Sequence, residues 1–270
     1  MRRTLTLPFA VCLLVFSASA SWGADKHPSQ RTTPPSSQTT SIKTDTLFTQ
    51  REALTYIAKL NEIPAGDGEI RLHKTQHEGR DAYRVTAQGR TNELVDMLFN
   101  IRGEADGLFA ANGFSPISFH FAFTERDRPR ELGVRYDPTT KTLVGLTRKK
   151  ARVRERREPA AEVYDPFSAL YLLRSRDLAP GSSQQIAVFT GKERYQIIAR
   201  VVRKEKTFLI DGERPAVRLH LQGFKASDGA RKNVLPAETT LWVTPEPTHV
   251  PLKLESFLPF GQFVVELNGQ

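Results

Sequence analysis

The sequence predicts a mainly β protein, built as one large curled antiparallel sheet or barrel-like shell that packs one short helix at about 165–174. Runs that alternate apolar and polar residues recur after residue 50, and Gly, Pro, Asn and Asp separate them. Strands and helices do not alternate, so the sheet should be antiparallel. Because about a dozen strands in one open sheet would expose long edges, we expect it to curl or close.

Residues 1–20 have the pattern of a cleaved secretory signal peptide. Two arginines follow the first methionine, an apolar run occupies 5–16, and small residues end at Ala20. The run is shorter than the roughly 20 apolar residues that span a membrane. We therefore expect cleavage after Ala20, with Ala24 as the alternative, no transmembrane segment afterwards, and a periplasmic protein whose peripheral attachment to a membrane stays open.

Cysteine usage and charge limit the chemistry of the exported chain. Cys12 is the sole cysteine and lies in the apolar run, so it leaves with the signal. Disulfides and Cys-ligated metals are then excluded. Loss of the two arginines changes the charge from 39 − 30 = +9 to 37 − 30 = +7. This charge suits anionic lipid, lipopolysaccharide or an envelope protein as partner, although a generally basic proteome would explain it equally well.

The rest of the chain divides into a tether and one domain. Residues 21–46 are rich in Ser, Thr and Pro and predict a disordered tether, whereas 47–270 predict a single β-rich domain. Its first hairpin should turn at 63–68, and its second at 77–81. Residues 92–99 are a competing short helix, with Asn92 as a candidate cap.

The clearest strand is 117–124, which alternates aromatic and polar residues and predicts one aromatic face. Its candidate ligand-binding side chains are Phe119, Phe121 and Phe123. Further strands are expected at 132–136, 143–146, 186–189, 195–201, 208–210, 217–221, 239–244, which carries Trp242, 250–258 and 263–267.

The predicted helix begins with two complementary signals. Asp165 can accept hydrogen bonds from the free N–H groups of the first turn, and Pro166 suits the first helical position. An apolar helix of about three turns is marginal alone in water, so it should pack against the sheet. The side chains at its i, i+3, i+4 and i+7 positions are Phe167, Leu170, Tyr171 and Arg174.

A basic run at 148–157 is the most distinctive surface feature. If the run is extended, alternate side chains project from one face and form a ribbon about 26 Å long at roughly 3.3 Å per residue. Its candidate phosphate-binding residues are Arg148, Lys150, Arg152, Arg154 and Arg156. A solvated hairpin face, or an edge strand charged against aggregation, is the alternative. Nucleic acid is not expected, because no aromatic residue interleaves the run.

The sequence offers no catalytic motif. A nucleophile elbow, a P-loop and a dinucleotide fingerprint are all absent, and His73 and His77 lie on a strand entering a turn, where their spacing does not favour a metal site. Helix capping explains Asp165, and an outward strand position explains Glu255. We therefore expect no enzymatic activity, no metal and no cofactor.

The order of motifs resembles a bacterial exported family catalogued as domain of unknown function 3108. The resemblance covers about 50–270. It is carried by IPAG at 63–66, DPFSALYLLR at 165–174, the loop at 178–181, and the ending from LWV at 241–243 through Pro251, Leu254, Pro259, Phe260 and Gly261. It implies an exported β-rich, barrel-like protein and supplies no catalytic residues. The basic run is not part of the family pattern.

These observations favour a non-enzymatic envelope protein that binds a lipid or another apolar or anionic envelope ligand in or on the curled sheet. A structural or scaffolding partner of an envelope complex is the alternative, and a carboxylate hydrolase is the third.

Overall fold

The computed structural model describes residues 48, 50–97, 100–125, 128–149, 151–226, 232–236, 238–259 and 261–269. The predicted signal at 1–20, the predicted tether at 21–46, and the side chains of Lys150 and Phe260 lie outside these ranges.

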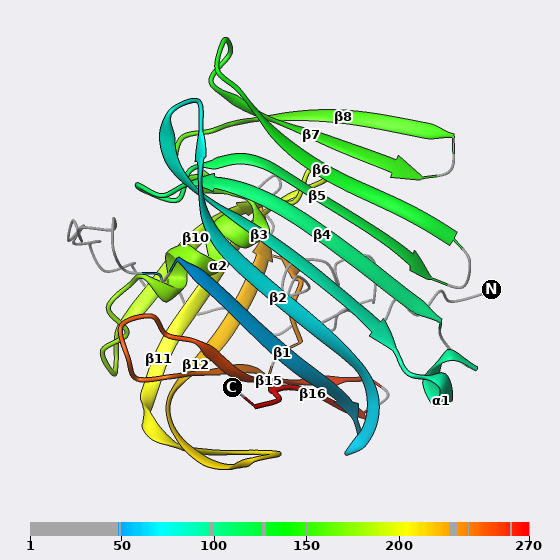
Figure 1. The fold of residues 1–270 in the computed structure, drawn as a ribbon, viewed down its shortest axis with the longest axis vertical. Helices are drawn as coiled ribbons and strands as arrows, with labels where there is room; N and C mark the ends of the chain where they lie inside the picture. The colour runs from blue at the N-terminus through cyan, green and yellow to red at the C-terminus, as the bar shows by residue number, and fades with distance from the viewer. Residues whose placement is uncertain are drawn as a thin grey trace.

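The first half of the sheet consists of consecutive antiparallel neighbours (Figure 1). They are β1 (Arg51–Leu60), β2 (Ile63–His77), β3 (Arg80–Thr91), β4 (Ile101–Ala110), β5 (Pro116–Glu125), β6 (Arg128–Asp137), β7 (Thr142–Lys149) and β8 (Arg152–Pro159). The short helix α1 (Glu93–Asp96) lies between β3 and β4.

The second half follows the helix α2 (Pro166–Arg174) and joins the first half through β1 and β16. Its strands are β9 (Val163–Tyr164), β10 (Ser183–Phe189), β11 (Arg194–Leu209), β12 (Gly212–Lys225), β13 (Lys232–Asn233), β14 (Thr239–Val243), β15 (Pro251–Leu258) and β16 (Gly261–Leu267). The sheet edges are β8 and β9, and β9 with β10 is the one parallel pair in the described part of the chain.

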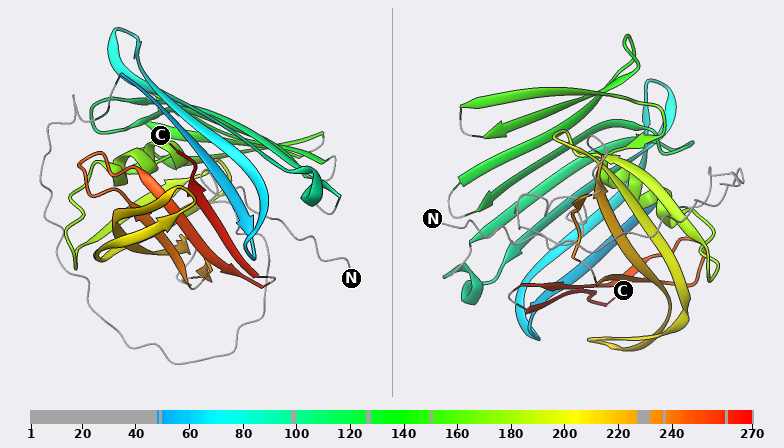
Figure 2. Two further views of the ribbon diagram at one scale, coloured as in Figure 1. Left: turned by 60° about the horizontal axis from the view of Figure 1, so that its bottom comes forward. Right: turned by 180° about the vertical axis from the view of Figure 1, so that it is seen from behind.

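The two halves curl toward each other and enclose α2 (Figure 2). The protein is therefore mainly β, with a nearly closed, barrel-like sheet and one short packed helix, and the predicted fold class is confirmed. Hairpin connections place the C-terminal ends of β1, β3, β5, β7 and β15 at one end of the shell, which we call the α1 end. Helix α2 packs nearer the opposite end, since the Tyr171 ring lies 5.5 Å from the ring of Phe109, close to the β4–β5 connection.

Three details differ from the sequence-based expectations. The first hairpin turns at Asn61 and Glu62, whose φ angles are 48° and 66°, and 63–68 continues as strand β2. The predicted strand 195–201 and the first two residues of the predicted strand 208–210 form one strand, β11, and Ile210 lies in the turn that follows. Asn92 does cap α1 by accepting from the Val95 N–H, but the helix within the described residues is only four residues long. Local turn residues indicated the wrong positions because cross-strand pairing sets where each strand ends.

Helix α2 begins as its capping residues predict. The Asp165 Oδ1 accepts from Phe167 N at 2.8 Å and from Ser168 N at 3.1 Å, and Pro166 occupies the first turn. Phe167 is 1% exposed and meets Phe119 edge-on at 5.5 Å between ring centroids. Leu170 is half-buried, so it packs less completely than Phe167. The helix turns its next side chain, Tyr171, fully inward instead.

A buried ion pair joins α2 to β1. The Arg174 side chain is 1% exposed, and its two terminal nitrogens donate to Glu52 Oε1 at 2.8 Å and Oε2 at 2.6 Å. Its Nε donates to Thr248 O at 3.0 Å, and the Tyr171 hydroxyl donates to Glu52 Oε1 at 3.0 Å. The guanidinium also lies 5.0 Å from the Phe48 ring centroid. These contacts satisfy a charge that burial would otherwise penalise heavily.

Trp242 and Gly261 hold the second half of the sheet together. The Trp242 Nε1 donates to Glu205 Oε1 at 2.8 Å, and the Lys253 ammonium lies 4.9 Å from its ring centroid. Gly261 has φ of 138°, and a Cβ there would collide with the Asn61 amide, which accepts from Gln262 N at 2.9 Å. Only glycine fits this close approach.

Replacing Glu52 by Ala should destabilise the protein by about 3 kcal/mol, because it leaves the Arg174 charge buried without its carboxylate. Asp106→Ala is the matched control, since it removes an exposed pair with Arg84 on the outer face and should cost less than about 1 kcal/mol. Urea unfolding measures both. Equal midpoints for the two variants would contradict the importance of the buried pair.

Phe167→Ala should cost about 4 kcal/mol, because it opens a cavity between α2 and Phe119. Leu170→Ala should cost less than about 2 kcal/mol, because that side chain is only half-buried. The comparison uses thermal melting with calorimetry. A larger loss from the Leu170 variant would show that α2 packs in a different orientation.

Candidate functional site

A row of directly paired residues crosses the inner face of β1–β8 near the α1 end. Residues opposite one another in an antiparallel sheet project to the same face. The row reads Tyr56, Gly68, Gly89, Gly103, Phe123, Arg130, Lys149 and Arg152. From β1 to β8 the row therefore contains an aromatic ring, three glycines, a second aromatic ring and three cations.

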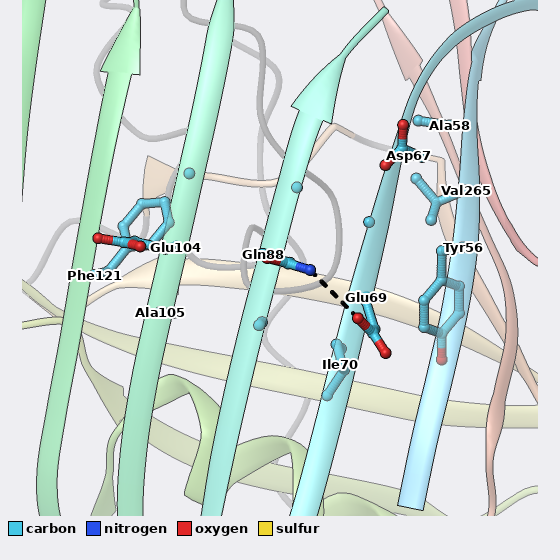
Figure 3. Close-up of a pocket in the computed structure, with 14 residues that line it drawn as sticks. Tyr56, Ala58, Asp67, Glu69, Ile70, Gln88, Glu104, Ala105, Phe121 and Val265 are labelled. Carbon is cyan, nitrogen blue, oxygen red and sulfur yellow. Dashed lines mark hydrogen bonds between the residues drawn. The ribbon is translucent and has the colours of Figure 1, made fainter.

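The next row toward α2 continues this arrangement with Ile70, Ala87, Ala105 and Phe121. We call Gly68, Ala87, Gly89, Gly103 and Ala105 the small-residue floor. With Tyr56, Ala58, Val265 and Phe121 it lines a hollow of about 60 Å³ (Figure 3). The residues that line the hollow come from β1, β2, β3, β4, β5 and β16, so only the folded sheet assembles it.

The three predicted aromatic residues have different environments. Phe119 is buried against Phe167, so it belongs to the core and the expectation that it contacts a ligand is wrong. Phe121 lines the hollow and stacks on Phe123, with 5.0 Å between ring centroids. Phe123 is half-buried and has the Arg130 guanidinium 5.8 Å from its ring centroid.

The predicted continuous basic ribbon does not exist, because β7 ends at Lys149 and β8 begins at Arg152. The chain reverses between them, so Arg148 lies on the outer face, 3.5 Å from Glu131, with the opposite orientation from Arg152 and Arg154. No Gly, Pro, Asn or Asp marks this turn, which is why the sequence read as one extended strand.

The cations of the β7–β8 hairpin differ in whether they form ion pairs. Arg156 forms two ion pairs, with Glu193 at 3.0 Å and with Glu158 at 2.7 Å. Lys149, Arg152 and Arg154 are exposed, and no carboxylate in the described ranges lies within ion-pair distance of them. We call these three residues the cationic edge.

The outer face of β2–β5 is charged but internally paired. Arg84 bonds Asp106 at 2.8 Å, Arg90 bonds Asp67 at 3.3 Å, and Gln88 donates to Glu69 at 3.3 Å (Figure 3). Within the described residues, no group of three His, Cys, Asp or Glu side chains is arranged to hold a metal. The exposed cations Lys149, Arg152 and Arg154 differ from these pairs because they lie on the inner face, in or beside the row that includes Gly103 and Phe123.

The two carboxylates considered for hydrolysis, Glu255 and Asp165, both contact other groups of the protein. Glu255 pairs with Lys253 at 3.2 Å. Asp165 is wholly buried at the start of α2, and burial raises the pKa of its carboxyl to about 6, although hydrogen bonds from Ser168 and Phe167 oppose that shift. Its Oδ2 is buried and has no hydrogen-bond partner among the described residues.

The sequence analysis missed the floor and part of the cationic edge. Small residues alternate along β3 at 87 and 89, and along β4 at 103, 105 and 107. Such alternation marks a strand face without side chains, and it could have been recognised. The placement of Lys149 in the cationic edge, and of Arg130 beside it in the same row, required the register between strands, which the sequence does not show.

The fold and the inner-face site together define a curled β shell with a helix at one end and a sparsely filled inner face at the other. The chain belongs to the family described as protein of unknown function (DUF3108), whose model matches residues 55–268. No curated protein matches the sequence.

Among solved structures, the fold is similar to a crystal structure of a beta-barrel-like protein of domain of unknown function DUF1849 from Brucella abortus. The TM-score is 0.51 at 9% identity, covering 80% of this chain and 94% of that one. A putative lipoprotein from Parabacteroides distasonis aligns at 8% identity with a TM-score of 0.32, over 82% of this chain and 96% of its own. In the part of the chain that the structure describes, no helix is both long and apolar enough to cross a bilayer.

Asp165→Asn should flatten the pH dependence of stability between about pH 4 and pH 6. The carboxyl of the folded protein holds its proton up to a pKa of about 6, whereas the unfolded chain releases it near 3.8. Wild-type stability should therefore fall as pH rises through this window, by about 3 kcal/mol at 1.36 kcal/mol per pKa unit. Asn still accepts from the first-turn N–H groups.

Urea unfolding at several pH values measures the difference between the two proteins. An identical slope for wild type and Asp165→Asn would show that this carboxyl is ionised in the folded protein.

Proposed function

We propose that this protein is a non-enzymatic component of the cell envelope that binds an anionic amphiphile on the inner face near the α1 end. The apolar chain would lie on the small-residue floor, and the anionic head group would meet the cationic edge. The observation that carries this proposal is the single register row that leads from Gly68, Gly89 and Gly103 past Phe123 to Arg130, Lys149 and Arg152.

The dimensions favour a chain lying along the sheet rather than a fully enclosed ligand. Pockets for drug-sized ligands usually measure about 300 to 1,000 Å³. A hollow of about 60 Å³ can take only the end of an apolar chain. From Gly103 on β4 to Lys149 on β7, three strand spacings of roughly 4.8 Å give about 14 Å, which leaves room for the remainder of the chain.

The chemistry of the small-residue floor and of the cationic edge fits an anionic amphiphile. Glycine and alanine leave backbone and methyl surface on the floor, and Phe121 and Phe123 supply aromatic walls. Arginine bonds phosphate through two parallel N–H donors, and Arg152 and Arg154 have no carboxylate to displace among the described residues. Export to the periplasm, expected from residues 1–20, would place the protein among anionic lipids.

Ala87→Phe tests the floor. The new ring should fill the hollow and weaken binding of lyso-phosphatidylglycerol, an anionic single-chain lipid, at least tenfold. Thr86→Phe is the matched control: it adds the same ring one residue away, on the outer face, and should change the affinity less than twofold. Isothermal calorimetry below the micellar concentration measures binding, and thermal melting checks folding.

The head-group contact is tested in the same assay with Arg152→Glu/Arg154→Glu and, as control on the same hairpin, Arg148→Glu. The double variant should lose the preference for phosphatidylglycerol over phosphatidylcholine head groups, and the control should keep it. Equal binding by wild type, Ala87→Phe and the double variant would reject the proposal. Recovery of one stoichiometric protein partner, with no extractable lipid, would support the scaffolding alternative.

A further inference from the structure

Large apolar side chains are exposed beside the entrance to the floor. Ile63 is 53% exposed, Leu94 is 57% exposed and Met97 is 78% exposed. Leu94 and Met97 are three residues apart, so they share one side of α1, and no residue of α1 is buried. The helix is held against β2 by Asn92, whose Nδ2 donates to Pro64 O at 2.7 Å. We call Ile63, Leu94 and Met97 the apolar rim.

The apolar rim and the cationic edge lie at the same end of the shell. Ile63 follows the β1–β2 turn, α1 follows β3, and Lys149 and Arg152 end β7 and begin β8, all of which are connections at the α1 end (Figure 1). On the same end, Phe257 near the end of β15 is 47% exposed. This end therefore combines solvent-exposed apolar groups with unpaired cations, and the floor opens between them.

The charges indicate how a flat anionic surface would meet this end. Beside the apolar rim, Asp96 is neutralised by Arg102 and Asp67 by Arg90, while Glu62 and Glu93 are exposed. The electrostatic attraction must therefore come from the β7–β8 side, where Lys149, Arg152 and Arg154 have no carboxylate within ion-pair distance in the described ranges. Apolar insertion on one side and cations on the other is the pattern that holds peripheral proteins on anionic membranes.

We infer that the α1 end docks on an anionic lipid bilayer, with the apolar rim inserted at the level of the head groups. A second copy of the chain is the alternative occupant, and the tests below distinguish it from a bilayer. Docking goes beyond the proposed function, since it requires no ligand on the floor. It would let an amphiphile pass between bilayer and floor without crossing water.

The first test is co-sedimentation of the full chain with vesicles of phosphatidylglycerol and phosphatidylcholine, and with vesicles of phosphatidylcholine alone. Wild type should bind the anionic vesicles at least tenfold more strongly. Leu94→Asp/Met97→Asp should lose at least tenfold of that binding. Phe208→Asp is the control, because Phe208 is 71% exposed but lies at the tip of the β11–β12 hairpin, and it should change binding less than twofold.

The second test places a probe on the rim. Cys12 is the sole cysteine and is expected to leave with the signal, so a single introduced cysteine in the exported chain takes one label; in an uncleaved chain Cys12→Ser removes the second thiol. An environment-sensitive fluorophore on Met97→Cys should shift to shorter wavelength with anionic vesicles, and the same label on Phe208→Cys should not. A shift only at residue 208, no vesicle binding by wild type, or a concentration-dependent dimer that Leu94→Asp/Met97→Asp dissociates would each overturn the inference.

The two proposals fail in different measurements. Ala87→Phe should keep vesicle binding while losing lyso-phosphatidylglycerol below its micellar concentration. Leu94→Asp/Met97→Asp should lose vesicle binding while still binding lyso-phosphatidylglycerol below its micellar concentration. If the rim variant binds vesicles as wild type does, docking through the rim is rejected, whatever the floor binds.

Discussion

The buried pair of Arg174 with Glu52 is the contact on which the rest of the arrangement depends. It joins the end of α2 to the first strand, across 122 residues of chain, in a shell that contains no disulfide among its described residues. A guanidinium at that depth is tolerated only because two carboxylate oxygens, a carbonyl and two aromatic rings surround it. The pair therefore fixes where α2 lies, and α2 decides which end of the shell is filled.

The two ends of the inner face differ because of that placement. Near α2, rings such as Phe109 and Phe167 fill the interior, and Gly107 lets Phe167 approach so closely that an added Cβ would lie 2.6 Å from its ring. Toward the α1 end, glycine and alanine continue along the same strands, but neither helix of the described ranges covers them, and Ala87, Gly89 and Gly103 are only partly buried. Glycine weakens a strand unless something approaches it closely. At Gly107 that neighbour is α2, and at Gly103 it is the Phe121 ring, 3.4 Å from where a Cβ would lie. Over the rest of the small-residue floor a ligand chain would take its place.

The sequence predicted features that depend on neighbours along the chain. The Asp165–Pro166 start of α2 and the aromatic alternation of 117–124 both follow from local rules, and both are present. It could not predict Glu52 as the partner of Arg174, because nothing near either residue indicates the other. The prediction of one extended strand at 148–157 was wrong for a related reason. Lys149 and Arg152 pair across a turn that contains no turn-forming residue, so alternation alone placed Arg148 on the wrong face.

The distribution of charge separates structural side chains from those available to a partner. Outer-face residues such as Arg84 and Arg90 face acidic residues on neighbouring strands, and Arg156 is held by Glu193, so these cations stabilise the sheet's own register. At the edge of the sheet, β8 has a neighbour on one side only, and Arg152 and Arg154 lack such acidic residues opposite them: their paired positions are Lys149 and Thr147. Like charges placed opposite one another destabilise a hairpin. The repulsion between Lys149 and Arg152 therefore destabilises this hairpin, and an anion bound between the two side chains would remove that repulsion.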